Sequence, residues 1–146
     1  MKHDATKKNV LYENVNTNYF MLKNSKLYFL VFDQYSEECS IASISTSGGS
    51  YTVYGKIPFY SEFLYVIGNR AYYYGGPYGT DEFMETSGLV EYDMSAKTYR
   101  LIVEDWDMTF FSFTSDLIIR EIYENEMLSA LWICDGNGNS KQFAVG

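Results

Sequence analysis

The chain has 146 residues and a formal net charge of −8 at pH 7, and 47% of its residues are hydrophobic, with 15 Tyr and 10 Phe. This length allows one domain with a hydrophobic core, and the aromatic content favours strands over helices. The acidic balance argues against a nucleic-acid partner, and no apolar run approaches the about 20 residues that a membrane-spanning helix needs.

Residues 1–16 are interpreted as the end of a unit that precedes the first complete one. Residues 8–15 match the last strand of the units described below, and residues 1–4 match the tail of a third strand. No apolar stretch follows Met1, so we expect no secretion signal.

The chain repeats at a nearly constant period. Turns that open on Asp4, Thr46, Asp93 and Asp135 follow one another at steps of 42, 47 and 42 residues. A second marker keeps the same spacing, because a pair of turn residues separates two apolar runs in each unit: Asn24-Ser25, Gly68-Asn69 and Thr114-Ser115. A repeat of this length with four short strands is typical of a β-propeller blade.

Three complete units follow, over residues 17–57, 58–104 and 105–146, with four predicted strands in each. The predicted strands are 19–22, 26–33, 39–45 and 51–56; 63–67, 70–74, 88–93 and 98–103; 109–113, 116–123, 128–134 and 141–145. The repeat predicts that Tyr28, Tyr72 and Ile118 occupy equivalent positions. Consecutive apolar residues, as in 27–32, indicate burial on both faces of a sheet.

The sequence therefore predicts an all-β fold of β-propeller-type blades, each with four antiparallel strands. About three complete blades plus a leading strand would make a partial or open propeller, and another all-β arrangement such as a sandwich is the alternative. Known propellers close with about four to eight blades. We therefore expect a piece of a longer protein, a ring completed by identical copies, or an open arc, and we favour the first. Exposed edges of the terminal blades would favour self-association.

Cys39 and Cys134 are the only cysteines. The repeat places Cys39 at the start of one third strand and Cys134 at the end of another, two blades later. We therefore predict two buried free thiols in preference to a disulfide.

The repeat unit resembles those of the six-bladed propellers of the low-density-lipoprotein-receptor type and of related Tyr-rich bacterial propellers of unknown function. The resemblance rests on residues 89–93 and 131–136, where an apolar strand ends in Asp before a turn, and on the Tyr-rich segments Leu11-Tyr12 and Tyr72-Tyr73-Tyr74. It implies a binding or scaffolding role, often extracellular, with no shared catalytic residues.

In the four-strand repeat, acidic and basic residues fall mostly at opposite edges of each unit, where the strands end. The first edge, where second and fourth strands end, carries thirteen of the nineteen acidic residues and only Lys56: Glu13, Asp33, Glu37, Glu38, Glu62, Asp81, Glu82, Glu85, Glu104, Asp105, Asp107, Glu124 and Glu126. The other edge collects Lys7, Lys8, Lys23, Lys26, Arg70, Lys97 and Lys141, with Asp4, Asp93, Asp116 and Asp135. We expect the acidic edge to attract cationic partners.

Aromatic residues share the acidic edge, and exposed rings beside carboxylates suit stacking on sugars or contact with Lys- and Arg-rich protein surfaces. The longest connection, residues 75–87, is the first candidate for a contact loop. The alternative interpretation is that several rings pack under the loops and that the acids only keep the protein in solution. The predicted contact residues are Tyr35, Glu37, Glu38, Tyr60, Tyr78, Asp81, Glu82, Asp105, Trp106, Asp107, Tyr123 and Glu124.

The sequence predicts no catalytic, metal or cofactor site. A single histidine, His3, excludes His-based triads and His metal clusters. Residues 135–139 resemble the start of a calcium loop, but the chain supplies no acidic residue at the loop's last ligand position, so a tight hairpin explains them better.

We therefore expect a non-catalytic binding or scaffolding module that engages a protein or a glycan through its acidic, aromatic edge. Two alternatives stay open: part of a carbohydrate-active enzyme, and an acidic inhibitor or immunity-type protein that covers a basic partner. The resemblance implies an extracellular or cell-surface location; without it, a cytoplasmic one is expected.

Overall fold

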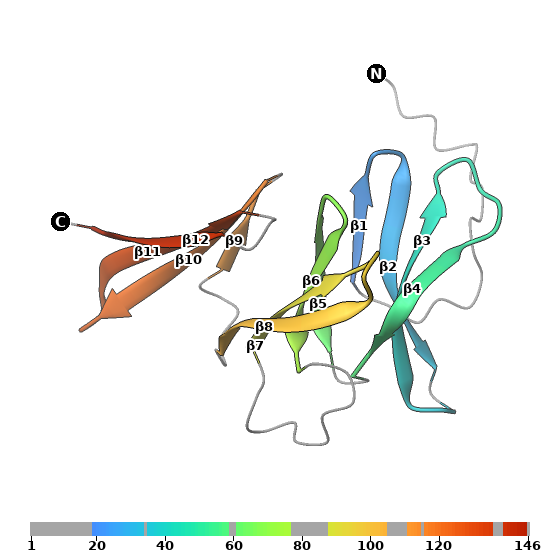
Figure 1. Ribbon diagram of the computed structural model, residues 1–146, viewed down its shortest axis with the longest axis horizontal. Coiled ribbons are helices and arrows are strands. Elements are labelled where there is room, and N and C mark those ends of the chain that lie inside the picture. Colours follow the sequence, from blue (N-terminus) through green and yellow to red (C-terminus); the bar gives the residue numbers. More distant parts are fainter. Residues whose placement is uncertain are drawn as a thin grey trace.

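The structure, a computed structural model, describes residues 19–33, 35–58, 61–76, 88–104, 111–114, 116–135 and 139–145. These residues form twelve strands and no helix, arranged as three four-stranded antiparallel sheets. Each sheet contains four consecutive strands, and the three sheets follow one another along the molecule (Figure 1). The prediction of an all-β chain with three successive four-stranded units is confirmed.

Sheet 1 has the strand order β1-β2-β3-β4. Its strands are β1 (Phe20–Lys23), β2 (Lys26–Asp33), β3 (Glu38–Ser45) and β4 (Thr52–Ile57). The second strand has the predicted bounds, and the bounds of the other three differ from the prediction by one residue.

Sheet 2 has the order β5-β6-β7-β8. Its strands are β5 (Glu62–Ile67), β6 (Arg70–Gly75), β7 (Gly88–Asp93) and β8 (Thr98–Glu104). The third strand of this sheet has the predicted bounds, and each of the others is longer by one residue at one end.

Sheet 3 has the order β12-β11-β10-β9. Its strands are β9 (Phe111–Phe113), β10 (Leu117–Glu124), β11 (Met127–Asp135) and β12 (Ser140–Ala144). The predicted start of the first of these, residue 109, lies outside the described residues.

Several hairpins close with residues in the left-handed backbone region. Asn24 and Ser25, between β1 and β2, have φ angles of 50° and 59°, and Asn125 and Glu126, between β10 and β11, have 52° and 64°. Two successive residues of this kind match the twist of the strands that they join. Thr114 lies between β9 and β10, as predicted, but its N–H donates to the Leu117 carbonyl oxygen at 2.9 Å, and the second strand begins at residue 117, one residue later than predicted.

Positions that are equivalent in the sequence repeat are also equivalent in the structure, with one correction. Tyr28 and Tyr72 are each the third residue of the second strand of their sheet, and both face the following sheet. In sheet 3 this position belongs to Ile119, whereas Ile118 packs back against sheet 2. The predicted equivalence of Ile118 is wrong because the second strand begins one residue later, and a shift of one residue moves a side chain to the other face.

Two hydrophobic clusters lie between the sheets. The cluster between sheets 1 and 2 contains Leu30 and Ile41 from one side and Tyr73 and Tyr92 from the other, all 0–1% exposed. At the inner strands, the Lys23 ammonium donates to the Val66 carbonyl oxygen at 2.9 Å and joins β1 to β5.

The cluster between sheets 2 and 3 contains Tyr72 and Leu89 on one side and Phe111, Ile118 and Cys134 on the other. Sheet 2 is therefore buried on both faces. The prediction of two buried faces concerns the apolar run 27–32 in sheet 1, where Phe29 and Leu30 are both buried. The outer face of sheet 1 has its own buried centre, formed by Phe29, Ala42 and Ile44.

The prediction of two buried free thiols is confirmed. Cys39 and Cys134 are both buried, neither forms a disulfide, and they belong to different clusters. Burial raises the pKa of the Cys39 thiol to about 12, so this group stays protonated and unreactive near neutral pH.

The described strands close no barrel. The structure therefore establishes three packed four-stranded sheets, whereas a ring of blades and the predicted unit boundaries stay predictions.

Gly55 in β4 leaves room for the ring of Tyr92 from sheet 2. A Cβ atom at position 55 would lie 2.1 Å from the Tyr92 hydroxyl oxygen, which donates its proton to the Tyr54 carbonyl oxygen at 2.8 Å. We expect Gly55→Ala to lower the free energy of unfolding in urea by about 2–3 kcal/mol, because the ring must move and this hydrogen bond is lost. Thr52→Ala, exposed on the same strand, is the control, with an expected change under about 0.5 kcal/mol. Equal losses in both variants would contradict the close approach.

Candidate functional site

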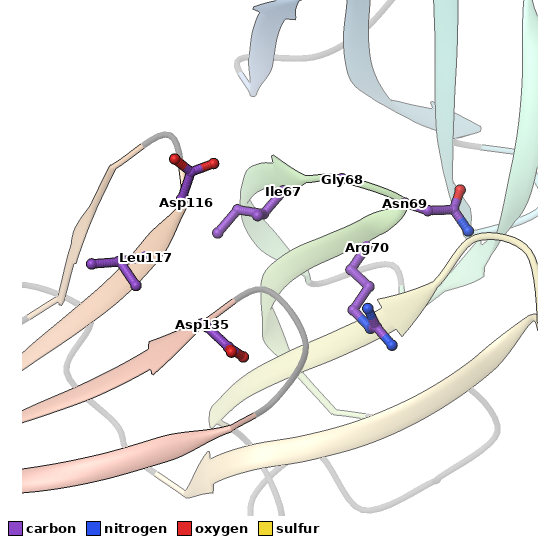
Figure 2. A pocket seen from close by; sticks show the side chains of 7 residues that line it. All are labelled: Ile67, Gly68, Asn69, Arg70, Asp116, Leu117 and Asp135. Atoms are coloured by element: carbon purple, nitrogen blue, oxygen red, sulfur yellow. The ribbon is translucent and has the colours of Figure 1, made fainter.

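A pocket of about 560 Å³ lies between sheets 2 and 3. Ile67, Gly68, Asn69 and Arg70 reach it from the hairpin between β5 and β6, and sheet 3 contributes Asp116, Leu117 and Asp135 (Figure 2). Its volume falls within the range of small-molecule sites, which are about 300–1,000 Å³.

Local hydrogen bonds position the pocket residues. Gly68 has a φ of 57°, which allows the tight turn that brings Asn69 and Arg70 to the pocket. The Asp135 carboxylate accepts two hydrogen bonds from Asn139, one from its backbone N–H and one from its side-chain amide, both at 2.9 Å. These bonds close the hairpin that the sequence predicted at residues 135–139.

A charged network lies beside the pocket. The Glu91 side chain is only 8% exposed. Its carboxylate forms ion pairs with the Arg100 guanidinium at 3.0 Å and with the Arg70 guanidinium at 3.4 Å. Its second oxygen accepts a hydrogen bond from the Tyr72 hydroxyl at 2.8 Å. These partners compensate the desolvation of a buried carboxylate.

The network also affects which charged groups a ligand in the pocket would contact. The Arg70 guanidinium faces Glu91, and it lies 3.8 Å from the Asp93 carboxylate. Asp116 and Asp135 line the same pocket, so groups of both charge signs reach it. This arrangement can hold a small polar molecule.

The charges sort by edge as the sequence predicted within each sheet. The acidic edge carries seven carboxylates and one lysine among the residues that the structure describes: Asp33, Glu37, Glu38, Glu62, Glu104, Glu124 and Glu126, with Lys56. At this edge the ends of neighbouring strands are paired: Asp33 lies opposite Glu38, and Gly88 lies opposite Glu104. The pocket lies at the other edge.

Three of the predicted contact residues lie in or next to the turn between β2 and β3. The Tyr35 side chain is fully exposed, at 102% of its reference area, and Glu37 has a φ of 53°. The Asp33 carboxylate accepts hydrogen bonds from the backbone N–H groups of Tyr35 and Ser36, which lower the pKa of Asp33 and keep it ionised. Glu38 is less available because it pairs with Lys56.

Tyr123 and Glu124 lie at the end of β10, and both are exposed. The Tyr123 hydroxyl donates to the Glu121 carboxylate at 2.7 Å. This group and the turn between β2 and β3 lie near opposite ends of the molecule's longest axis (Figure 1). The structure therefore does not bring the described contact residues together into one compact patch. The other predicted contact residues lie outside the described residues: Tyr60, Tyr78, Asp81, Glu82, Asp105, Trp106 and Asp107.

Sequence reasoning missed the pocket and the Glu91 network. Arg70, Asp116 and Asp135 were assigned to the correct edge, but as balancing charges in separate sheets. The signal for Glu91 was a single carboxylate inside the apolar segment 88–92. A charged residue in a strand with two buried faces requires a partner, and Arg70 and Arg100 flank it on the neighbouring strands.

No group of three or more His, Cys, Asp or Glu side chains suited to a metal ion occurs among the described residues. The single histidine, His3, lies outside them. The described part of the chain also contains no helix with the length and apolar character needed to cross a membrane.

Comparison of the chain with family models, with curated proteins and with solved structures finds no match.

Tyr72 provides a test of the buried network. Burial and the hydrogen bond to Glu91 raise the pKa of the Tyr72 hydroxyl well above its usual value. The unfolded chain therefore loses this proton first, so the stability that the group contributes is present below about pH 10 and is lost as the pH rises further. We expect Tyr72→Phe to reduce the alkaline slope of the unfolding free energy by up to about 1.4 kcal/mol per pH unit.

The same variant should lower stability at neutral pH by about 1.5–3 kcal/mol, because Glu91 loses a hydrogen-bond donor. Urea unfolding at a series of pH values measures both effects. The control is Tyr35→Phe, which changes a fully exposed ring and should keep the wild-type slope. A wild-type slope in Tyr72→Phe would contradict the role of the network.

Proposed function

We propose that the three sheets are propeller-type blades and that the chain is a non-catalytic binding module whose acidic edge engages a basic protein surface. The propeller assignment is supported by an equivalent position in successive sheets, the third residue of the second strand, whose side chain packs toward the next sheet. Tyr28 and Tyr72 hold this position, and each packs toward the next sheet. Neighbouring sheets packed face to face in chain order are what a propeller requires.

The observation that carries the binding function is the sorting of charge. Among the described residues, the acidic edge has seven carboxylates against one lysine, and that lysine is already paired with Glu38. The opposite edge has five cations and three carboxylates: Lys23, Lys26, Arg70, Lys97 and Lys141, with Asp93, Asp116 and Asp135. A field with this asymmetry steers cationic partners to one edge of each sheet.

The spread of the edge favours a macromolecular partner. Its carboxylates belong to all three sheets, and the Tyr35 ring is available for contact beside Glu37. Cationic groups on a protein surface stack well on such rings. A protein is favoured over a glycan because carboxylates dominate the described part of the edge and attract the cationic groups of a basic protein surface.

Titration of a fluorescent oligolysine peptide tests the proposal. We expect binding that weakens as salt is raised, because exposed charges are screened. Glu37→Lys and Glu124→Lys should each weaken it by about threefold, equivalent to about 0.6 kcal/mol for the charge reversal at one exposed position.

The matched control is Asp116→Lys, which makes the same change of charge at the opposite edge. Equal weakening by all three variants would show an effect of net charge alone and would sink the proposed edge. No binding at low salt would have the same consequence. Signal on a glycan array that survives high salt would point instead to a sugar ligand.

A further inference from the structure

The outer face of sheet 3 is equivalent to a face that, in sheets 1 and 2, is covered by the following sheet. In sheets 1 and 2 the face that carries Tyr28 or Tyr72 packs against the following sheet. Ile119 holds the same position in sheet 3 and belongs to the outer face. The register places Ile133 and Lys141 in one row with Ile119, and Leu131 and Phe143 in the next row with Glu121.

This outer face is apolar and only half-buried. Ile119, Leu131 and Ile133 are intermediate in exposure, and Phe143 and Tyr123 are each 44% exposed. None of the residues in the two rows is buried. The outer face of sheet 1 differs, because its central residues Phe29, Ala42 and Ile44 are already 0–2% exposed.

We propose that the outer face of sheet 3 binds the same face of a second copy of this chain, forming a two-fold symmetric dimer. The charges on the face are self-complementary. The two rows carry one acid, Glu121, and one cation, Lys141, placed diagonally on either side of β11. A two-fold axis between the faces, crossing the line from Glu121 to Lys141 at a right angle, brings each Glu121 to the Lys141 of the other copy. Isologous contacts of this kind are the commonest in soluble oligomers.

The size of the face sets the expected strength. The strands of sheet 3 have 3, 8, 9 and 5 residues, and at about 3.3 Å per residue and about 4.8 Å between strands they give a face of about 400 Å² per copy. The total of about 800 Å² is smaller than that of a stable interface and suits a weak contact. We therefore expect a reversible dimer whose population depends on concentration, not an obligate one.

Sedimentation equilibrium of the 146-residue chain over a concentration series tests the proposal. The wild type should show a monomer–dimer equilibrium, and Phe143→Lys should raise its dissociation constant at least about tenfold. Leu22→Lys is the matched control, because Leu22 is 64% exposed on the outer face of sheet 1 and the charge change is the same. It should leave the equilibrium unchanged. Circular dichroism checks that each variant is folded.

A charge exchange tests the symmetry. Glu121→Lys alone and Lys141→Glu alone should each weaken the dimer, because like charges then meet across the axis. An equimolar mixture of the two variants should associate more strongly than either, since both contacts in the mixed dimer pair opposite charges. The double variant should also recover association.

Other results would overturn the proposal. A wild type that stays monomeric at every concentration would do so, as would a dimer that is insensitive to Phe143→Lys. Dissociation by Leu22→Lys would assign the contact to sheet 1 instead. Equal association of the mixture and of the single variants would reject the pairing of Glu121 with Lys141.

Discussion

The burial of sheet 2 on both faces is the constraint on which the rest of the structure depends. A strand in such a sheet cannot alternate between apolar and polar residues, and β6 and β7 do not. Both neighbouring sheets are then held at a fixed distance by side chains such as Tyr92 and Tyr72, which point to opposite sides. The spacing explains why β4 has a glycine, Gly55, where the Tyr92 hydroxyl reaches the backbone.

The same constraint accounts for the charged network. Glu91 lies on a strand whose other residues are apolar or uncharged up to Asp93, and it could not be buried there without partners. Arg70 and Arg100 come from the strands on either side, and Tyr72 supplies the donor from within the sheet. The pocket follows from this arrangement, because the hairpin that presents Arg70 also forms one wall facing sheet 3.

Most of the fold could be predicted from the sequence, because hairpin turns and apolar runs recur at a regular spacing. The errors are local. Thr114 offers a hydroxyl and a backbone N–H that both bond to Leu117, so the second strand begins one residue later than the sequence pattern predicted, and the faces of Ile118 and Ile119 exchange. The candidate site was less predictable. The edge of each residue follows from strand direction, but the fact that Arg70 lines one pocket with Asp116 and Asp135 depends on how two sheets pack, which local spacing does not encode.

The acidic edge extends over three sheets, and this spacing limits the repulsion between its carboxylates. Packed sheets lie about 10 Å apart and the Debye length in physiological salt is about 8 Å. Carboxylates on different sheets therefore repel one another weakly. Within the turn between β2 and β3, two backbone N–H groups donate to the Asp33 carboxylate and stabilise its charge. A small ligand could neutralise only one such turn. A basic surface that spans several sheets would gain a contribution from each, which is why the proposed partner is a protein and not a small ligand.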